Sequence, residues 1–296
     1  MKLAPFDAGA GPQPGAVDVD RQTIVALDGF RSALELIDGG DSALQAASDL
    51  ESRQQHVHEL GSVRLLAPLA PRSIRDCLVF EEHMRNAAQA LARLTGGEPP
   101  SIPPVWYEQP IYYKGNPHSV VGHEADVRWP RYSKLMDYEL ELAAVIGRTG
   151  VDISRERALE HVFGYTIFND ASARDAQGRE MAGQLGPAKG KDFDTGNVLG
   201  PWIVTADELG DPHSLTMVAR VNGEEWSRGS SAAMHHPFDA IIAFISQSET
   251  LHPGEVIGSG TVGTGCGLEH GRFLQEGDVV ELEIERIGML RNRFVR

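Results

Sequence analysis

At residues 137–147 the chain reads Asp137-Tyr138-Glu139-Leu140-Glu141-Leu142-Ala143-Ala144-Val145-Ile146-Gly147. Side chains two residues apart in a β-strand point to the same face, so Glu139 and Glu141 should lie side by side. Leu140 and Leu142 then point to the opposite face, and the apolar residues that follow indicate that the strand runs into a core. We therefore expect a β-rich fold in which one strand carries two neighbouring carboxylates.

Two carboxylates that face a protein interior repel each other unless a proton or a cation lies between them. A hard divalent cation such as Mg²⁺, Mn²⁺ or Ca²⁺ accepts ligands that are all oxygen atoms. The alternative is that Glu139 and Glu141 form a solvated pair on an exposed face of a sheet, because glutamates are mostly exposed. The strand alone leaves both interpretations open.

A third carboxylate favours the cation. Asp170 ends the apolar segment 162–169, which predicts a strand whose end lies at the rim of a site. The polar turn or short helix after it supplies Arg174 and Gln177, and the segment 189–195 supplies Lys191. Carboxylates around a metal ion, with arginine and lysine nearby, are typical of a site for an anionic, oxygen-rich substrate.

Residues 1–66 differ in pattern from the rest of the chain. The segment Thr23–Leu27 predicts a short strand, and apolar residues recur at helical spacing from residue 30 to about residue 60. Gly39-Gly40 interrupts the helical spacing, and Asp41-Ser42 restarts it as an N-cap. Because the stretch 64–72 contains two prolines, we expect a small N-terminal α/β appendage at 1–66 and a catalytic domain at 67–296.

Beyond residue 100 the patterns are mostly those of strands and turns. Asn222-Gly223 predicts a two-residue hairpin between strands at 218–221 and 224–226. Residues 279–284 alternate as a strand does, and residues 158–162 and 240–248 have the pattern of short helices. With 32 glycines and 17 prolines, we expect an α+β fold that is mainly β and has long functional loops.

The chain of 296 residues carries 42 acidic and 27 basic side chains, a net charge of −15. This charge argues against binding to nucleic acid, and no apolar stretch approaches the roughly 18 residues of a membrane helix. The first residues lack the apolar run of a signal peptide. Cys77 and Cys266 form no Cys-x-x-Cys pair, which argues against a disulfide scaffold or a thiolate zinc site. We expect a cytoplasmic protein without nucleic-acid or membrane partners.

The glycine-rich segment Gly258–Gly263 matches the dinucleotide fingerprint G-x-G-x-x-G. That fingerprint needs a helix directly after it, so that the pyrophosphate meets the helix N-terminus. The next residues, 264–267, contain two more glycines and cannot start a stable helix. We therefore expect a glycine-rich loop and no dinucleotide site.

Several motifs, taken in order over roughly residues 70–296, resemble those of the fumarylacetoacetate hydrolase superfamily. They are Asp-x-Glu-x-Glu-Leu at 137–142, Asn-Asp-x-Ser-Ala-Arg-Asp-x-Gln at 169–177, Gly-Lys-x-Phe at 190–193, Gly164-Tyr165, Gly200-Pro201-Trp202 and the loop 253–261. The resemblance implies a mixed β-sandwich roll and a homodimer. It also implies that Glu139, Glu141 and Asp170 are metal ligands and that Lys191 is catalytic.

Further matches are to fumarylacetoacetase itself. By that resemblance, Asp76 is a fourth metal ligand and His83, seven residues later, is a catalytic histidine on the same helix or lid, which spans residues 76–86. Four other positions match residues that contact substrate there. They are Tyr113, Arg174, Gln177 and Thr261.

The sequence departs from the family pattern around the histidine. Fumarylacetoacetase orients its histidine with a glutamate, and the corresponding stretch here ends in Gln275, which we expect to take this place. A glutamine can hold a hydrogen bond but does not stabilise an imidazolium as a carboxylate does. Glu269, or Glu81 or Glu82 beside His83, are the alternatives.

These residues predict a divalent-metal-dependent hydrolase, with Mg²⁺ as the expected ion and Mn²⁺ or Ca²⁺ as alternatives. Its reaction would be cleavage of a C–C bond in a small anionic dicarbonyl substrate, a 1,3-diketo acid of the acylpyruvate or fumarylacetoacetate type. The first alternative is a 2-oxo acid decarboxylase, hydratase or isomerase that uses the same site to stabilise an enolate. The second is a metal-binding relative without catalytic activity.

Overall fold

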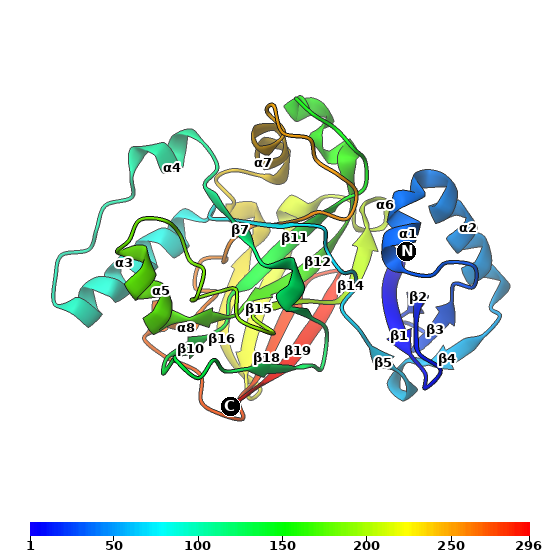
Figure 1. The fold of residues 1–296 in the computed structure, drawn as a ribbon, viewed down its shortest axis with the longest axis horizontal. Helices are drawn as coiled ribbons and strands as arrows, with labels where there is room; N and C mark the ends of the chain where they lie inside the picture. The colour runs from blue at the N-terminus through cyan, green and yellow to red at the C-terminus, as the bar shows by residue number, and fades with distance from the viewer.

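The computed structural model describes the backbone of residues 1–296 and every side chain except those of Leu94 and Thr95. The fold is α+β and contains more strand than helix, as expected from the sequence. Figure 1 shows the N-terminal strands and helices on one side of the molecule, beside the larger remainder. No helix in the described chain has both the length and the apolarity that crossing a membrane requires.

The largest sheet has twelve strands, ten of which follow the order β4-β3-β2-β1-β14-β12-β11-β17-β6-β7, while β5 pairs with β1 and β8 with β14. Their bounds are β1 (Lys2–Asp7), β2 (Pro12–Asp18), β3 (Thr23–Ala26), β4 (Val57–Glu59), β5 (Arg64–Leu65), β6 (Ile74–Cys77), β7 (Tyr112–Gly115), β8 (Val120–Val121), β11 (Leu140–Ile146), β12 (Val162–Asp170), β14 (Asn197–Thr205) and β17 (Val256–Gly258).

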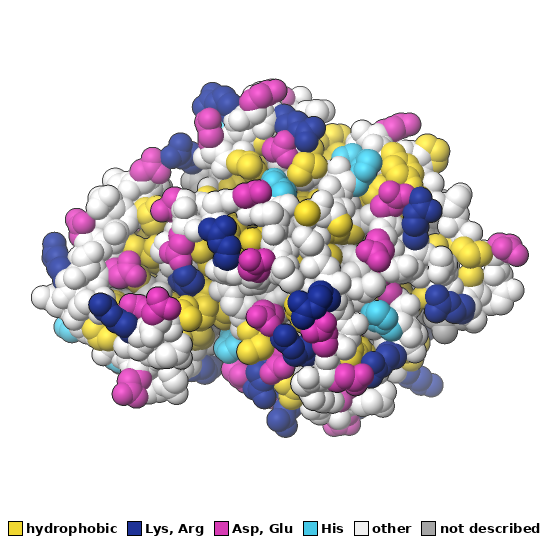
Figure 2. Space-filling view, turned by 180° about the vertical axis from the view of Figure 1, so that it is seen from behind, with side chains coloured by type: hydrophobic (Ala, Val, Ile, Leu, Met, Phe, Trp, Pro, Cys, Tyr) yellow, Lys and Arg dark blue, Asp and Glu magenta, His cyan; other side chains and the backbone are white. Residues whose placement is uncertain are grey.

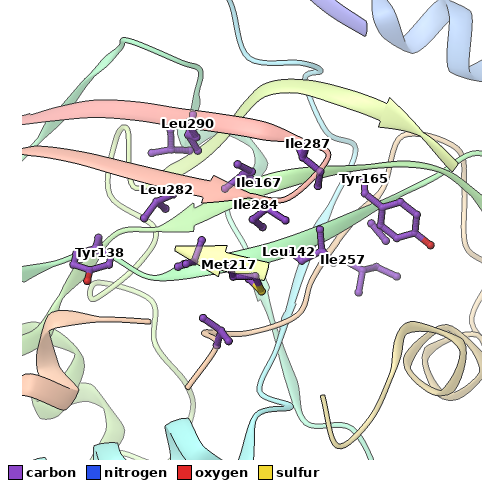
Figure 3. Close-up of a cluster of buried hydrophobic side chains, with 14 of the residues drawn as sticks. Tyr138, Leu142, Tyr165, Ile167, Met217, Ile257, Leu282, Ile284, Ile287 and Leu290 are labelled. Atoms are coloured by element: carbon purple, nitrogen blue, oxygen red, sulfur yellow. The ribbon is translucent and has the colours of Figure 1, made fainter. Parts of the chain in front are cut away.

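A five-stranded sheet packs against one face of the largest sheet. Its order is β16 (Glu224–Ser230), β15 (Thr216–Val221), β18 (Val279–Ile284), β19 (Gly288–Val295) and β9 (Asp126–Arg128), and a separate pair joins β10 (Met136–Asp137) to β13 (Ser172–Ala173). Figure 3 shows the core between the sheets, in which Leu142 and Ile167 of the large sheet lie near Leu282 and Ile284 of the smaller one. This burial of aliphatic side chains holds the two layers together.

The helices lie around the sheets, with α1 and α2 over the N-terminal strands and α3, α5 and α8 together at the opposite end of the molecule (Figure 1). The helices are α1 (Ala33–Asp38), α2 (Gly40–Arg53), α3 (Glu81–Thr95), α4 (Pro104–Glu108), α5 (Arg174–Met181), α6 (Ala206–Leu209), α7 (Phe238–Ile245) and α8 (Gly267–His270). Short 3-10 turns are η1 (Leu60–Ser62), η2 (Pro117–Ser119), η3 (Arg155–His161), η4 (Pro212–Ser214) and η5 (Ser231–Ala233).

Strand β11 has the two faces that the sequence predicts. Leu140 and Leu142 point into the core between the sheets, whereas Ala143 and Val145 belong to a second apolar cluster on the other face. Glu141 has the same parity as this second face. The alternative of a solvated glutamate pair is wrong, because Glu139 is 6% exposed and Glu141 is 0% exposed.

The predicted hairpin and the strand at 279–284 are confirmed as β15–β16 and β18. Asn222 and Gly223 both have positive φ angles, 51° and 79°, as a tight hairpin turn requires. In place of the helix predicted at 158–162, the structure has the 3-10 turn η3, which ends at His161 because β12 begins at Val162. The helix predicted at 240–248 corresponds to α7, Phe238–Ile245.

The helical prediction for residues 30–60 is wrong at both its restart and its end. The second helix starts at Gly40, and the hydroxyl of Ser42 donates to the carbonyl of Gly39 instead of capping the helix. Gln54, with a positive φ of 49°, ends that helix, and the strand β4 follows. A left-handed residue cannot continue a right-handed helix, which explains the early end.

The N-terminal segment joins the large sheet through β1, which pairs with β14 at Lys2↔Val204 and Leu3↔Ile203. The expected division of the chain at 66/67 stays a prediction.

Acidic and basic side chains are interspersed over the face shown in Figure 2.

His213 predicts a pH dependence of stability that is remote from the carboxylates. Its Nε2 accepts a hydrogen bond from the backbone N–H of Phe238 at the start of α7, 3.1 Å away, with Asp211, Asp239 and Arg155 as its charged neighbours. Burial lowers the pKa of His213 from its usual 6.5, so the folded state binds the proton less tightly than the unfolded chain. This contribution to stability is present above about pH 6.5 and is lost as pH falls through the lowered pKa.

We expect the melting temperature of the wild type to fall more steeply between about pH 8 and pH 5 than that of His213→Gln, whose amide oxygen can still accept the bond. His123 and His236 also have lowered pKa values, so the difference between the two proteins isolates His213. Identical slopes would contradict the prediction.

Candidate metal centre and active site

Four carboxylates meet on one face of the large sheet, and each offers an oxygen atom within 4.8 Å of the others. Asp76 comes from β6, Glu141 from the start of β11, Glu139 from the position just before β11, and Asp170 from the end of β12. The strands lie in the order β12-β11-β17-β6, so residues distant in sequence become neighbours. All four are buried, with exposed fractions between 0% and 6%.

Gly258 on β17 makes room for this cluster. It lies opposite Ala143 on one side and Asp76 on the other. A Cβ atom at this position would stand 2.4 Å from Oδ1 of Asp76 and 2.9 Å from Oε2 of Glu141. The glycine therefore allows two carboxylates from different strands to approach across it.

We expect Gly258→Ala to reduce divalent-metal affinity by roughly 10–100-fold, since it displaces two of the clustered carboxylates. Overpacking of this kind also costs about 1–3 kcal/mol of stability. Isothermal titration with Mg²⁺ and thermal melts measure the two effects. Gly61→Ala is the matched control, because no atom lies within 4 Å of a Cβ built there. Wild-type affinity in Gly258→Ala would contradict this role for Gly258.

The carboxylates differ in their charge environment. Burial, reinforced by the neighbouring acids, raises the pKa values of Asp76 and Glu141 well above the usual range, and burial raises that of Asp170 to about 6. Burial acts in the same direction on Glu139, but Lys191 and Arg174 outweigh it and lower its pKa. The protein alone therefore disfavours the fully ionised cluster, and an added cation would favour it.

The donor set fits a divalent ion. Oδ1 of Asp76, Oε1 of Glu141 and Oδ1 of Asp170 are buried, and none accepts a hydrogen bond from the residues that the structure describes. Unpaired buried carboxylate oxygens are costly, and several oxygen ligands are what Mg²⁺, Mn²⁺ and Ca²⁺ bind. These four side chains can hold such an ion.

Lys191 lies between two of the four acids. Its Nζ is 2.7 Å from Oε2 of Glu139 and 2.5 Å from Oδ2 of Asp170. Burial lowers the pKa of Lys191, but the attraction of Asp170 and Glu139 is larger, so the net pKa is raised. The hydroxyl of Tyr113 donates to the same oxygen of Asp170 at 2.7 Å. Lys191 therefore keeps a fixed positive charge beside the cluster.

Arg174 is buried and held by two acids. Its Nε donates to Oδ2 of Asp137 at 2.8 Å, and its Nη1 is 2.7 Å from Oε1 of Glu139 and donates to Oε1 of Gln177. Asp137 also accepts from the backbone N–H groups of Gly267 and Leu268. Asp137 is a site residue that the sequence does not predict, although its position two residues before Glu139 places it in the same alternating pattern.

The structure pairs His83 with Glu269. Nδ1 of His83 lies 2.8 Å from Oε1 of Glu269. The other oxygen of Glu269 accepts from Nδ2 of Asn86 at 2.7 Å and from the backbone N–H of Thr264 at 2.8 Å. The carboxylate is therefore fixed in position, and it can orient the imidazole and stabilise its protonated form.

Gln275, expected from the sequence to hold His83, lies elsewhere. Its amide donates to the carbonyls of Phe273 and Leu274 at the exposed start of a turn. Glu81 is bonded to Arg85 and Tyr107. The carboxylate partner of His83 is instead Glu269 on α8, which packs against α3. The two residues are 186 positions apart in the sequence, and the fold brings them together.

The prediction that residues 76–86 form one helix or lid is wrong. Asp76 belongs to the buried strand β6, which pairs with β17 and β7, and α3 begins only at Glu81. Asp76 is thus fixed by the sheet, and His83 stands in the first turn of a separate helix. The site therefore combines carboxylates held by the large sheet with a histidine held by helix α3.

The glycine-rich segment Gly258–Gly263 is confirmed as a loop after Gly258, the last residue of β17, and it contributes to the carboxylate site. The expectation that no helix starts within residues 264–267 is wrong, because the short helix α8 begins at Gly267. The N–H of Gly260 donates to Oε2 of Glu141 at 3.0 Å. The hydroxyl of Thr261 is buried and has no hydrogen-bond partner among the described residues. An unpaired polar atom in such a position is available to a ligand.

Comparison with known proteins identifies the family of this chain. Residues 73–295 match the family described as fumarylacetoacetate (FAA) hydrolase, C-terminal. The chain is 34% identical to the mitochondrial oxaloacetate tautomerase fahd2 of Xenopus laevis over 303 residues, which cover 100% of this chain and 90% of that protein. It is also 34% identical to the oxaloacetate tautomerase YisK of Bacillus subtilis over 273 residues, covering 89% and 86% of the two chains.

A solved structure, the fumarylacetoacetate hydrolase from Exiguobacterium antarcticum, matches with a TM-score of 0.77 at 30% identity and covers 100% of this chain and 99% of that one. The expected family resemblance is confirmed over the part of the chain that carries the carboxylates and Glu269. This chain belongs to the fumarylacetoacetate hydrolase family.

Proposed function

We propose that this protein is a divalent-metal-dependent tautomerase that interconverts the keto and enol forms of a 2-oxo dicarboxylic acid of the oxaloacetate type. The two relatives reported above are both named oxaloacetate tautomerases and align with most of this chain. This favours the isomerase alternative of the sequence analysis over its main expectation, a C–C hydrolase.

The observation that carries the proposal is the His83–Glu269 pair next to the carboxylate cluster. The pair lies beside the cluster, because Cys266, whose thiol donates to Glu269, is paired through its backbone with Glu139. Tautomerisation requires a group that moves a proton at carbon, close to a group that stabilises negative charge at oxygen. The two parts of this site meet those two requirements.

In the proposed reaction Asp76, Glu139, Glu141 and Asp170 hold the ion. A bound divalent cation supplies Lewis-acid polarisation of the substrate's 2-oxo and carboxylate oxygens. Nε2 of His83 removes the proton from the carbon next to the keto group, while Glu269 stabilises the imidazolium through Nδ1. The imidazolium of His83 then gives its proton to the enolate oxygen, so the substrate changes its bonding and keeps its composition.

The basic residues act on the charge that develops during proton transfer. Lys191 places a fixed ammonium group beside the cluster. The buried guanidinium of Arg174, which is paired with Glu139, is a second positive charge near it. Preorganised charges of this kind stabilise an oxyanion without reorganisation at the moment of reaction. Tyr113, Gln177 and the unpaired hydroxyl of Thr261 are the proposed substrate contacts.

C–C hydrolysis is the second candidate, because a histidine with a carboxylate partner can also activate water. The chain's likeness to the fumarylacetoacetate hydrolase of Exiguobacterium antarcticum supports it. In that case His83 would take the proton from water, and the water oxygen would attack the carbonyl carbon of an acylpyruvate.

One experiment separates the two functions. The Mg²⁺-loaded protein is mixed with freshly dissolved enol oxaloacetate, and the decay of the enol's ultraviolet absorbance is compared with the rate without protein. In parallel, acylpyruvates are incubated with the protein and assayed for released pyruvate. The proposal predicts faster enol decay without pyruvate release. Release of pyruvate with no effect on enol decay would overturn it in favour of the hydrolase.

The other properties of the proposed enzyme rest on the family resemblance and on charge. We propose Mg²⁺ as the ion, with Mn²⁺ or Ca²⁺ as alternatives because oxygen ligands accept all three. A homodimeric state, a cytoplasmic location and the lack of nucleic-acid or membrane partners stay predictions.

A further inference from the structure

Next to the carboxylate cluster lies a second group of metal-ligating side chains with a different chemical character. His83, Cys266 and Glu269 each offer a ligand atom, a ring nitrogen, a thiol sulfur and a carboxylate oxygen, and these atoms lie within 4.8 Å of one another. All three residues are buried. The proposed reaction uses His83 and Glu269 but leaves Cys266 without a role.

Two of the three distances among these atoms can be compared with those of a tetrahedral zinc site, and the third, between the sulfur and a ring nitrogen of His83, is at most 4.8 Å. Zinc binds nitrogen and oxygen at roughly 2.0–2.2 Å and sulfur at roughly 2.3 Å, which places ligand atoms roughly 3.4–3.6 Å apart. Sγ of Cys266 is already 3.5 Å from Oε1 of Glu269. Nδ1 of His83 is 2.8 Å from the same oxygen, so this one distance must open by about 0.6 Å.

The surroundings also suit an ion of this kind. One thiolate, one carboxylate and one neutral imidazole around Zn²⁺ sum to zero charge, which a buried site requires. Asn86 and the N–H of Thr264 hold the remote oxygen of Glu269, and such outer hydrogen bonds orient metal ligands. Cys266 is fixed by its backbone pairing with Glu139 and by its position just before α8.

We propose that His83, Cys266 and Glu269 form an inhibitory site for Zn²⁺ and other thiolate-binding cations, separate from the four-carboxylate site. Binding replaces the Cys266 thiol proton, which is released to solvent, with a metal–sulfur bond. It also occupies the imidazole nitrogen that faces Glu269, and the proton of that nitrogen moves through solvent to Nε2, so His83 loses both its carboxylate partner and its free basic nitrogen. Binding of the metal does not depend on the proposed function. The inhibition does, because it requires that His83 act in the proposed reaction.

The sequence could not indicate this site. Cys266 and Glu269 are three residues apart, but His83 precedes them by more than half of the chain, and no Cys-x-x-Cys pair is present. Spacing rules recognise zinc sites whose ligands come in local pairs. Only the packing of α3 against α8 brings this third ligand into place.

The binding is tested by adding Cd²⁺ to protein saturated with Mg²⁺, and recording the ultraviolet charge-transfer band of a cadmium–thiolate bond. The carboxylate site contains no sulfur and gives no such band. We expect one thiolate bond per chain in the wild type and in Cys77→Ser, and none in Cys266→Ser. The absence of a band in the wild type, or its persistence in Cys266→Ser, would overturn the proposal.

X-ray absorption at the zinc edge keeps the test decisive if Cys266→Ser does not fold. Wild-type protein with one equivalent of Zn²⁺ and excess Mg²⁺ should show a single sulfur neighbour at about 2.3 Å. A shell of oxygen and nitrogen atoms alone would overturn the proposal.

The consequence for activity is measured separately. In excess Mg²⁺, Zn²⁺ should inhibit the tautomerisation of oxaloacetate by the wild type and by Cys77→Ser, and inhibition of Cys266→Ser should require at least about ten times more Zn²⁺. Equal sensitivity of the two cysteine variants would refute the inhibitory role. If the protein has no tautomerase activity at all, the proposed function fails, and the cadmium band still decides whether the site exists.

Discussion

Glu141→Gln should lower tautomerase turnover by at least about a thousandfold and remove the stabilisation that Mg²⁺ gives to the folded protein. A divalent ion supplies several kcal/mol of transition-state stabilisation, and each 1.36 kcal/mol corresponds to about tenfold in rate. Glu141 offers one of the unpaired buried oxygens and is fully buried. Its replacement leaves the site one anionic ligand short.

The same variant should have the opposite effect on the protein without metal. Burial and the nearby Asp76 and Asp170 raise the pKa of Glu141, so the ionised side chain is unfavourable in the folded state. A neutral glutamine of nearly the same shape removes that repulsion. We therefore expect the metal-free variant to melt at or above the temperature of the metal-free wild type.

Thermal melts with chelator and with Mg²⁺, together with the enol assay, measure these effects. Glu98→Gln makes the same chemical change at an exposed position and should behave as wild type in each. A Glu141→Gln protein that keeps both its activity and its Mg²⁺-induced rise in melting temperature would show that the ion does not bind where we place it.

His83→Ala should reduce kcat by roughly 10²–10⁴-fold, the usual contribution of a positioned acid–base group. Metal affinity should change little, because His83 is not among the four carboxylates. Glu269→Gln should give a smaller loss of kcat, since the imidazole remains but loses the carboxylate that stabilises its protonated form.

Steady-state kinetics and Mg²⁺ titrations separate the two quantities for each variant. The exposed His252 provides the control His252→Ala. A kcat for His83→Ala within about tenfold of the wild type would exclude His83 as the group that moves the proton, whatever reaction the protein catalyses.

Short-range patterns predicted the central part of this site well. The alternation in residues 137–142 is enough to place Glu139 and Glu141 on one face, and the apolar segment before Asp170 is enough to place that residue at the end of a strand. Both are local properties of β-strands, so they need no knowledge of tertiary structure.

The remaining parts depend on pairings between distant segments. Asp76 reaches the cluster because β6 pairs in parallel with β17. Parallel strands are not connected by a short hairpin, so no turn motif in the sequence predicts their pairing. The family pattern predicts Gln275 as the partner of His83, whereas Glu269 reaches His83 because α8 packs on α3. Side-chain chemistry limits the possible partners of His83 to a few residues, but only the packing of the helices determines which one contacts it.

The pairing of β1 with β14 has a consequence for the behaviour of shortened forms of this protein. Strand β14 pairs on one side with β12, which carries Asp170, and on the other with β1 and β8. Removing residues 1–66 would expose the N–H and C=O groups of β14 around Ile203 and Val204. Such an open strand recruits strands from other molecules. The N-terminal strands thus shield the sheet that carries the four carboxylates from self-association, and a shortened chain should aggregate although every proposed ligand is still present.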